Sequence, residues 1–232
     1  MEREKWIDMG KGIAILSVIF GHLSSLDSKN SIYLLVYAFH MPIFWIISGM
    51  LLSGKDYNNV SMLETIKKKA KSIMYPYVIF SLIIVAYNYI GLNLNLVSKS
   101  QFKLVVKNSV YFRGMNCLWF LPVLFVAEIV FIYLIKHRQN IVLWGISFAV
   151  IATLIAVFLS KTDLFKENPM KMYKKYCLIL PKVCFALSFI SLGYTIKEYF
   201  KIIKKYWLLF ALVGVSVSYY IIKVYHKKTD IN

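Results

Sequence analysis

The chain has 232 residues, of which 59% are hydrophobic, and its formal net charge at pH 7 is +17. The apolar residues form long blocks separated by lysine-rich stretches, which is typical of a polytopic helical membrane protein and excludes a soluble globular domain. Basic loops between apolar spans face anionic lipid headgroups, so we expect a membrane-lipid partner and no nucleic-acid partner. The odd number of cysteines in or beside apolar stretches argues against a disulfide framework or a zinc site; they are Cys117, Cys177 and Cys184.

The apolar blocks predict an all-α transmembrane bundle of about seven spans, each near the length that a bilayer core requires. No soluble domain or low-complexity linker interrupts them, so residues 1–232 are expected to form a single membrane-embedded domain. The first block is the shortest, and we interpret it as a retained helix because no small-residue cleavage pattern of a signal peptide follows it. The predicted spans are Met9–Leu26, Ile32–Leu52, Ile73–Leu92, Cys117–Ile135, Ile141–Leu159, Leu178–Ile196 and Tyr206–Val224.

The loop charges do not orient these spans. Lysine and arginine residues divide equally between the two sides of the predicted bundle. The positive-inside rule therefore leaves the orientation open.

The first span places two ionisable residues on one helix face. Lys11 and His22 are eleven residues apart in the stretch KGIAILSVIFGH, and at about 100° and 1.5 Å per residue their side chains lie roughly 16 Å apart along one face. Ionisable groups in a hydrophobic segment are costly and face a protein interior or a watery cavity, so the pair indicates a functional site. Asp8 lies three residues before Lys11, near enough on a helix to pair with it and hold its orientation.

The second span carries His40 two residues before Pro42. Proline in mid-helix removes a backbone donor and frees the carbonyl of Ala38, so the helix can kink and offer an imidazole and a carbonyl oxygen to a cavity. If the first two spans form a hairpin, His22 and His40 lie toward the same membrane face and can line one pocket. The alternative is that His40 only hydrogen-bonds a neighbouring helix. For the small residues Ser48 and Gly49, close helix packing is the favoured interpretation.

The fourth span adds an intramembrane acid and two aromatic residues. Glu128 can orient a histidine or contact a sugar, and pairing with a lysine near a neighbouring helix end is an equal alternative. Trp119 and Phe120 can stack on a sugar or adenine ring, although an aromatic belt at the membrane interface explains them equally well.

The motifs as a set resemble the integral-membrane acyltransferase family 3, in its sugar O-acetylase branch. WIDMGKGIAILSVIFGH is similar to the basic-x10-His helix of the family, FHMPIFWIISGMLL to its second helix, and KKKAKSIMYPYVIF to its basic run before a Tyr-Pro pair. LWFLPVLF resembles the Trp-Phe-Leu element, and FALSFISLGYTIKEYF resembles the late Leu-Gly-Tyr helix. Together the matches extend from Trp6 to Phe200 in the order of the family.

The resemblance implies an acyl-CoA donor, most simply acetyl-CoA, and an acceptor hydroxyl on a bacterial cell-surface glycan or its lipid-linked precursor. His22 would be the general base that takes the proton of the hydroxyl, or it would accept the acyl group transiently. Lysines near helix ends can hold the phosphates of the donor as charge-assisted donors. We expect Asp8 to support Lys11, and the predicted phosphate-binding residues are Lys11, Lys67, Lys68, Lys69 and Lys71, of which the last four also fit an ordinary anchor loop.

The resemblance also carries a departure from the family. Members usually have more membrane helices than this chain, which has one predicted span after the Leu-Gly-Tyr helix. The chain is therefore expected to be a fragment, a degenerate copy, or a compact version that completes its site by pairing with another chain, such as a second copy in a homo-oligomer.

Two alternatives to catalysis remain open at this point. A glycan or lipid transporter or flippase would show the same intramembrane acids and histidines without needing an acyl donor. An inactive membrane scaffold would need neither. We expect a multi-pass protein of the bacterial cytoplasmic membrane, and no required metal, because two histidines on separate helices without a nearby cluster of ligands make a weak zinc site.

Overall fold

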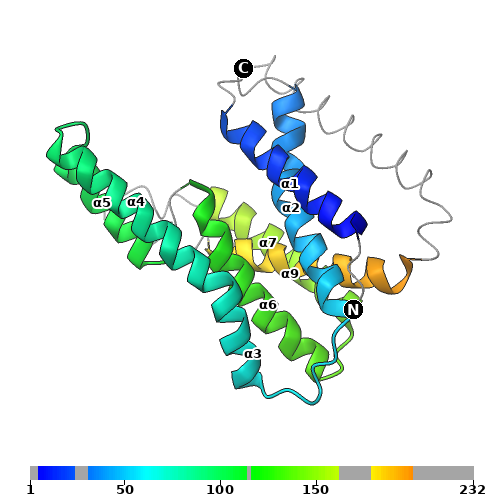
Figure 1. Cartoon of the computed structure of the whole chain (residues 1–232). Coiled ribbons are helices and arrows are strands. Elements are labelled where there is room, and N and C mark those ends of the chain that lie inside the picture. The colour runs from blue at the N-terminus through cyan, green and yellow to red at the C-terminus, as the bar shows by residue number, and fades with distance from the viewer. Residues whose placement is uncertain (1–4, 24–30, 114–115, 162–178, 201–232) are drawn as a thin grey trace. The chain divides into compact units, whose positions relative to one another are not determined.

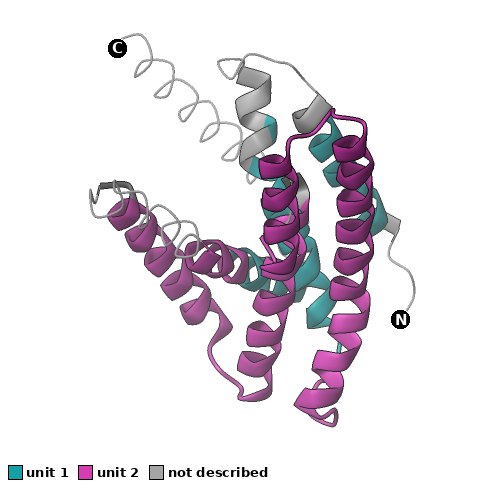
Figure 2. Ribbon diagram, turned by 90° about the vertical axis from the view of Figure 1, so that its left-hand side faces the viewer, with its two compact units in different colours: residues 1–55, 189–232 teal, residues 56–188 magenta. Residues whose placement is uncertain are grey.

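The structure is a computed structural model, and it is all-α (Figure 1). It describes residues 5–23, 31–113, 116–161 and 179–200. The chain divides into two compact units (Figure 2), of which unit 1 comprises residues 1–55 and 189–232 and unit 2 comprises residues 56–188.

The helices follow the apolar blocks of the sequence, with short 3-10 and π segments between some of them. In chain order they are α1 (Lys5–Leu23), α2 (Ser31–Ser53), α3 (Met62–Lys69), the π segment η1 (Ala70–Met74), α4 (Tyr75–Asn93), α5 (Lys99–Val110), the 3-10 segment η2 (Asn116–Trp119), α6 (Phe120–Lys136), α7 (Ile141–Lys161) and α9 (Ile179–Glu198).

Three of the described helices are long and apolar enough to cross a membrane, so the chain has the helices of a multi-pass membrane protein. Two of them, Ile141–Leu159 and Ile179–Glu198, lie where the sequence predicts spans. The third runs from Met62 to Asn93, so it begins well before the predicted start at Ile73. The cause is that α3 and η1 continue directly into α4, and the basic run is therefore helical rather than a loop.

The seven predicted spans are not shown. The predicted Ile32–Leu52 span is part of the helix α2, of which Phe39–Ser53 forms a shorter apolar helix. The predicted first span is the helix α1, which starts earlier, at Lys5, and so includes more charged residues. The predicted Cys117–Ile135 span starts as the 3-10 segment η2, which leaves 17 residues for α6. The predicted span Tyr206–Val224 lies outside the described residues.

Unit 1 is held together by close helix contacts at two glycines. The helices α1 and α2 pack along each other (Figure 1). A methyl group added at Gly193 of α9 would lie 1.9 Å from the carbonyl oxygen of Ile46 in α2, and one added at Gly49 would lie 2.0 Å from the carbonyl oxygen of Ile190. The two backbones therefore touch, which confirms the packing interpretation of Gly49.

Unit 2 contains a buried ion pair between α3 and α6. The Nζ atom of Lys69, at the end of α3, lies 2.5 Å from Oε2 of Glu128 in α6, and the two side chains are 17% and 7% exposed. The Nζ atom of Lys136 also donates to the carbonyl oxygen of Val60, just before α3, at 2.5 Å. These two contacts fix the basic helix against α6, because an unpaired charge in either position would be strongly unfavourable.

The helices of unit 2 begin and end with local hydrogen bonds. The side chain of Ser61 accepts from the backbone of Glu64 at the start of α3. Ser98 and Gln101 form a reciprocal capping box at the start of α5. The hydroxyl group of Tyr77 in α4 donates to the carbonyl oxygen of Ser109 in α5 at 2.8 Å, which fixes the end of α5 beside the start of α4.

Three helices end in a residue with left-handed backbone conformation that is not glycine. These residues follow α4, α5 and α6. At each end the amide of the left-handed residue and the amide of the next residue bond back to the helix in the Schellman pattern. They are Asn95, Phe112 and Arg138, with φ of 56°, 53° and 49°. The bulky Phe112 makes this conformation costly at the end of α5, so the surrounding structure must enforce it.

We expect Gly193→Ala to destabilise the protein by about 1 to 3 kcal/mol, because the new methyl group would overlap a backbone atom that cannot rotate away. The matched control is Gly12→Ala in α1, where an added Cβ has no heavy atom within 4 Å. Alanine should there leave stability unchanged or raise it by up to about 1 kcal/mol. Thermal unfolding of both variants in detergent, followed by circular dichroism, measures the difference; equal midpoints would contradict the close packing of α2 and α9.

We expect Glu128→Ala to cost about 3 to 5 kcal/mol of stability, since it leaves the buried Lys69 charge uncompensated. The control is Glu64→Ala, which removes a solvent-exposed pair at 2.8 Å to Lys68 whose side chains are 69% and 54% exposed. Exposed helical pairs contribute about 0.5 kcal/mol or less. Denaturant unfolding in detergent compares the two variants, and a Glu128→Ala protein as stable as Glu64→Ala would refute the buried pair.

Candidate active site

The predicted cationic residue of the first helix is paired as expected. The Nζ atom of Lys11 lies 3.3 Å from Oδ1 of Asp8 one helical turn away, and both side chains are partly exposed. The helix α1 continues to Leu23, so Lys11 and His22 belong to one uninterrupted helix. The side chain of His22 lies outside the described residues.

His40 is buried in α2 and hydrogen-bonds within its own helix. Its side chain is 4% exposed, and its Nδ1 lies 2.9 Å from the carbonyl oxygen of Val36 one turn earlier. A carbonyl can only accept, so Nδ1 donates and a neutral ring then carries its lone pair on Nε2. Pro42 lies inside the same helix, as predicted. The bond to the Val36 carbonyl fixes the orientation of the imidazole and leaves the lone pair on Nε2, which is what a base or an acceptor nitrogen needs.

The predicted phosphate-binding lysines lie around the junction of α3 and η1. Lys67, Lys68 and Lys71 are exposed, and Lys68 pairs with Glu64 in the preceding turn. Lys67 and Lys71 are four residues apart on a continuous helix, so they share one face. Both side chains are exposed at the surface of unit 2.

Glu128 is engaged by Lys69, which is the pairing with a lysine near a helix end that the sequence left as one of two alternatives. Its charge also acts on Tyr57, in the segment before α3. Burial first, and the carboxylate of Glu128 second, raise the pKa of the Tyr57 phenol to about 12. Tyr57 therefore stays protonated at any physiological pH.

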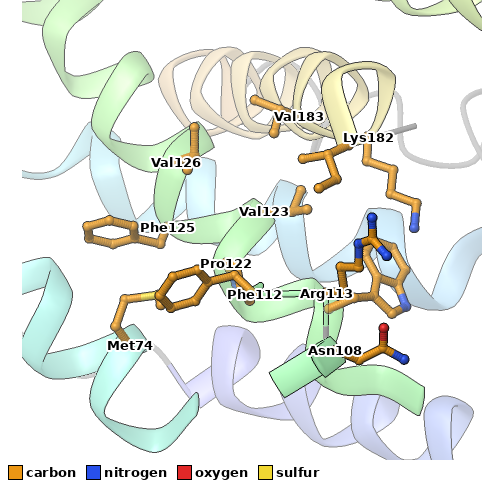
Figure 3. Close-up of a pocket in the computed structure, with 12 residues that line it drawn as sticks. Met74, Asn108, Phe112, Arg113, Pro122, Val123, Phe125, Val126, Lys182 and Val183 are labelled. Atoms are coloured by element: carbon orange, nitrogen blue, oxygen red, sulfur yellow. The ribbon is translucent and has the colours of Figure 1, made fainter. Parts of the chain in front are cut away.

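A cavity of about 550 Å³ lies in unit 2, between the end of α5, η1, the start of α6 and the start of α9 (Figure 3). One side is apolar, where Met74, Phe125 and Val126 lie (Figure 3). The polar ends of Asn108, Arg113 and Lys182 gather on the other side (Figure 3). The remaining lining residues are Phe112, Trp119, Pro122, Val123, Ile179 and Val183.

Trp119 is the predicted site residue that lines this cavity. Its ring meets Phe120 edge-on at 6.4 Å between centroids, and the Nζ atom of Lys182 lies 4.1 Å from the centre of its ring. A cation over an indole face is attracted by the ring quadrupole. Trp119 thus holds Lys182 in place at the cavity wall.

Arg113, Asn108 and Lys182 were missed by the reasoning from sequence. Arg113 and Lys182 entered the sequence analysis only in the count of loop charges on the two sides of the bundle. Nothing in the sequence around Asn108 indicated a site. Lys182 lies inside the predicted Leu178–Ile196 span, and a cation within an apolar span is a signal that would have found it.

The predicted site residues fall into both units. Unit 1 contains Asp8, Lys11, His22 and His40, whereas unit 2 contains Lys67, Lys68, Lys71, Trp119 and Glu128. Within unit 2 the residues also separate, because Glu128 pairs with Lys69 while Trp119 lines the cavity. Among the residues that the structure describes, no three His, Cys, Asp or Glu side chains gather as a metal site.

Comparison with known proteins gives a single clear result. A family model described as an acyltransferase domain matches residues 4–228. No curated protein and no solved structure matches the chain. The family match covers nearly the whole sequence and includes every motif above, and the chain therefore belongs to the acyltransferase 3 family of membrane acyltransferases.

Proposed function

We propose that the protein transfers an acetyl or another short acyl group from acyl-CoA to a hydroxyl of a cell-surface glycan or its lipid-linked precursor, in the bacterial cytoplasmic membrane. The observation that carries this proposal is the acyltransferase family match over residues 4–228. Supporting it, a paired cation and a histidine share the helix α1, as an enzyme that binds an anionic donor and activates a hydroxyl requires.

In this proposal His22 takes the proton of the acceptor hydroxyl while its oxygen attacks the thioester carbonyl. The carbon–sulfur bond then breaks, and His22 returns the proton to the departing thiolate, so the step is balanced without another reactant. An acyl group held transiently on His22 is the alternative route. Asp8 holds Lys11 toward the donor, and His40 provides a second imidazole on the neighbouring helix α2.

The exposed lysines Lys67, Lys68 and Lys71 are the proposed grip on the donor phosphates. Coenzyme A is soluble and arrives from the aqueous side, which suits side chains that water reaches. Trp119 is proposed to stack on a sugar ring. The pair with Lys69 supports a positioning role for Glu128, which keeps the basic helix against α6.

We propose that the full bundle has the seven spans predicted from sequence. The helix α6 has 17 residues, which at about 1.5 Å each gives roughly 26 Å, close to the thickness of a bilayer core. The helices α1 and α2 have 19 and 23 residues, which is also sufficient.

The transporter and the inactive scaffold are the competing functions. Family membership favours acyl transfer over transport, because the matching family model describes an acyltransferase domain. A transporter would need no acyl donor. Product formation that depends on acyl-CoA would distinguish the enzyme from a transporter. Formation of any product would distinguish it from an inactive scaffold.

We expect His22→Ala to lower the transfer of label from radiolabelled acetyl-CoA into the glycan fraction of membranes by about 10² to 10⁴-fold, the usual contribution of a general base. The matched control is His137→Ala, an exposed histidine just after α6 whose ring lies tilted against that of Tyr133, and it should keep full activity. Equal loss in both variants, or transfer unaffected by either, would remove His22 from the mechanism.

We expect Lys11→Gln to raise KM for acetyl-CoA by about 10 to 100-fold with a smaller change in kcat, because a charge-assisted bond to a phosphate acts in the ground state as well as in the transition state. Asp8→Asn should change KM in the same direction by less. Lys99→Gln, on the exposed start of α5, is the control. A fall in kcat at unchanged KM would instead place Lys11 at the reacting atoms.

A further inference from the structure

The cavity of unit 2 is not used by the proposed proton transfer. It is half open and has a volume of about 550 Å³, within the range of about 300 to 1,000 Å³ typical of small-molecule sites. A bare inorganic anion would occupy little of it, since a water molecule has a share of about 30 Å³ in the liquid. The cavity therefore suits a ligand with a substantial apolar part.

The charge of the cavity wall defines the other part of the ligand. Arg113 and Lys182 supply two cations and Asn108 supplies an amide, and none of the described residues that line the cavity is acidic. Arginine offers a planar fork that matches phosphate oxygens, and lysine adds a point charge. Both groups lie on the same side of the cavity, opposite Phe125 and Met74 (Figure 3).

The backbone that presents Arg113 is held in an unusual conformation. The amide of Arg113 donates to the carbonyl oxygen of Asn108 at 3.0 Å, and the amide of Phe112 donates to Ser109 at 3.4 Å. These two bonds close the Schellman turn and require φ of 53° at Phe112. Strain of this kind persists where the surrounding structure enforces it and is concentrated at ligand sites. Here it places Asn108, Phe112 and Arg113 on the cavity wall together.

Lys182 is held in place independently. It lies in the first turn of α9 with its Nζ atom 4.1 Å from the centre of the Trp119 ring. An anion between Lys182 and Arg113 would leave this contact in place, because the ring meets one face of the ammonium group and hydrogen-bond donors remain.

We propose that this cavity binds a phosphate ester on a long apolar chain, with the phosphate between Arg113 and Lys182 and the chain along the apolar side. Resting on the proposed function, the ligand is the lipid phosphate that carries the acceptor sugar, and Trp119 at the polar side is placed to meet that sugar. Binding itself requires no acyl donor, so it can be tested apart from transfer.

The test uses the full chain in phosphatidylcholine nanodiscs and a photoreactive hexadecyl phosphate as the probe. We expect crosslinks to map to peptides of α6 or α9. Unlabelled hexadecyl phosphate should compete at least about ten-fold better than hexadecanol or inorganic phosphate, because neither competitor offers both the charge and the chain.

Arg113→Gln and Lys182→Gln should each weaken probe binding by about ten-fold, the expected loss for one charge-assisted contact. Lys103→Gln, an exposed cation on the same helix as Asn108, should bind as the unaltered protein does. Arg113→Lys keeps the charge and should restore most of the binding. If Arg113→Gln does not fold, Lys182→Gln alone decides.

Four outcomes overturn the proposal. Equal competition by hexadecanol would mean that charge plays no part, and displacement by acetyl-CoA at lower concentration would assign the cavity to the donor. Equal competition by phosphatidylglycerol would assign it to bulk anionic lipid. Folded Arg113→Gln and Lys182→Gln proteins that bind the probe normally would show that these two cations do not hold the phosphate. Probe binding without acyl transfer would refute only the proposed function, whereas transfer without probe binding would refute only this inference.

Discussion

A charge within an apolar helix is stable only when another group compensates it, and this constraint organises unit 2. Lys69 ends a basic helix that lies against the apolar helix α6, and its contact with the buried Glu128 compensates the charge there. The pairing fixes α3 and η1 beside α6, so that Met74 and the residues after Trp119 form two walls of one cavity. The ion pair therefore helps to position the cavity walls, although neither partner lines the cavity.

Unit 1 depends on a steric constraint instead. The helices α2 and α9 touch at Gly49 and Gly193, where no larger side chain would fit. In a membrane the hydrophobic effect does not drive helices together, so close backbone contact and the dispersion attraction that it permits must do so. His40 lies on the same helix as Gly49, and its ring is fixed by Val36 of its own helix. The helix α2, which carries His40, is thus in direct backbone contact with α9.

Several helices and one ion pair of the candidate site could be predicted from local sequence signals. Uninterrupted apolarity placed the Ile141–Leu159 span correctly, and a three-residue spacing was sufficient to predict the Asp8–Lys11 pair. Other features had no local signal. The Schellman ends were hidden because Phe112 and Arg138 occupy positions where glycine is the usual marker. The cavity was hidden because Arg113 and Lys182 are far apart in sequence and line the same cavity only through long-range packing.

The cations of the chain differ in environment, and that difference separates the two proposed substrates. Lys67 and Lys71 are exposed to solvent, so each contributes weakly but is reachable by a soluble, highly charged donor such as coenzyme A. Arg113 and Lys182 line a half-open, mostly apolar cavity without an acidic lining residue among those described, where electrostatic attraction is less screened than at an exposed surface. A lipid-borne phosphate can enter such a space with its chain, whereas a soluble donor would have to leave its water behind. Under the two proposals, charges of the same sign would therefore bind different ligands, because their surroundings differ in exposure and polarity.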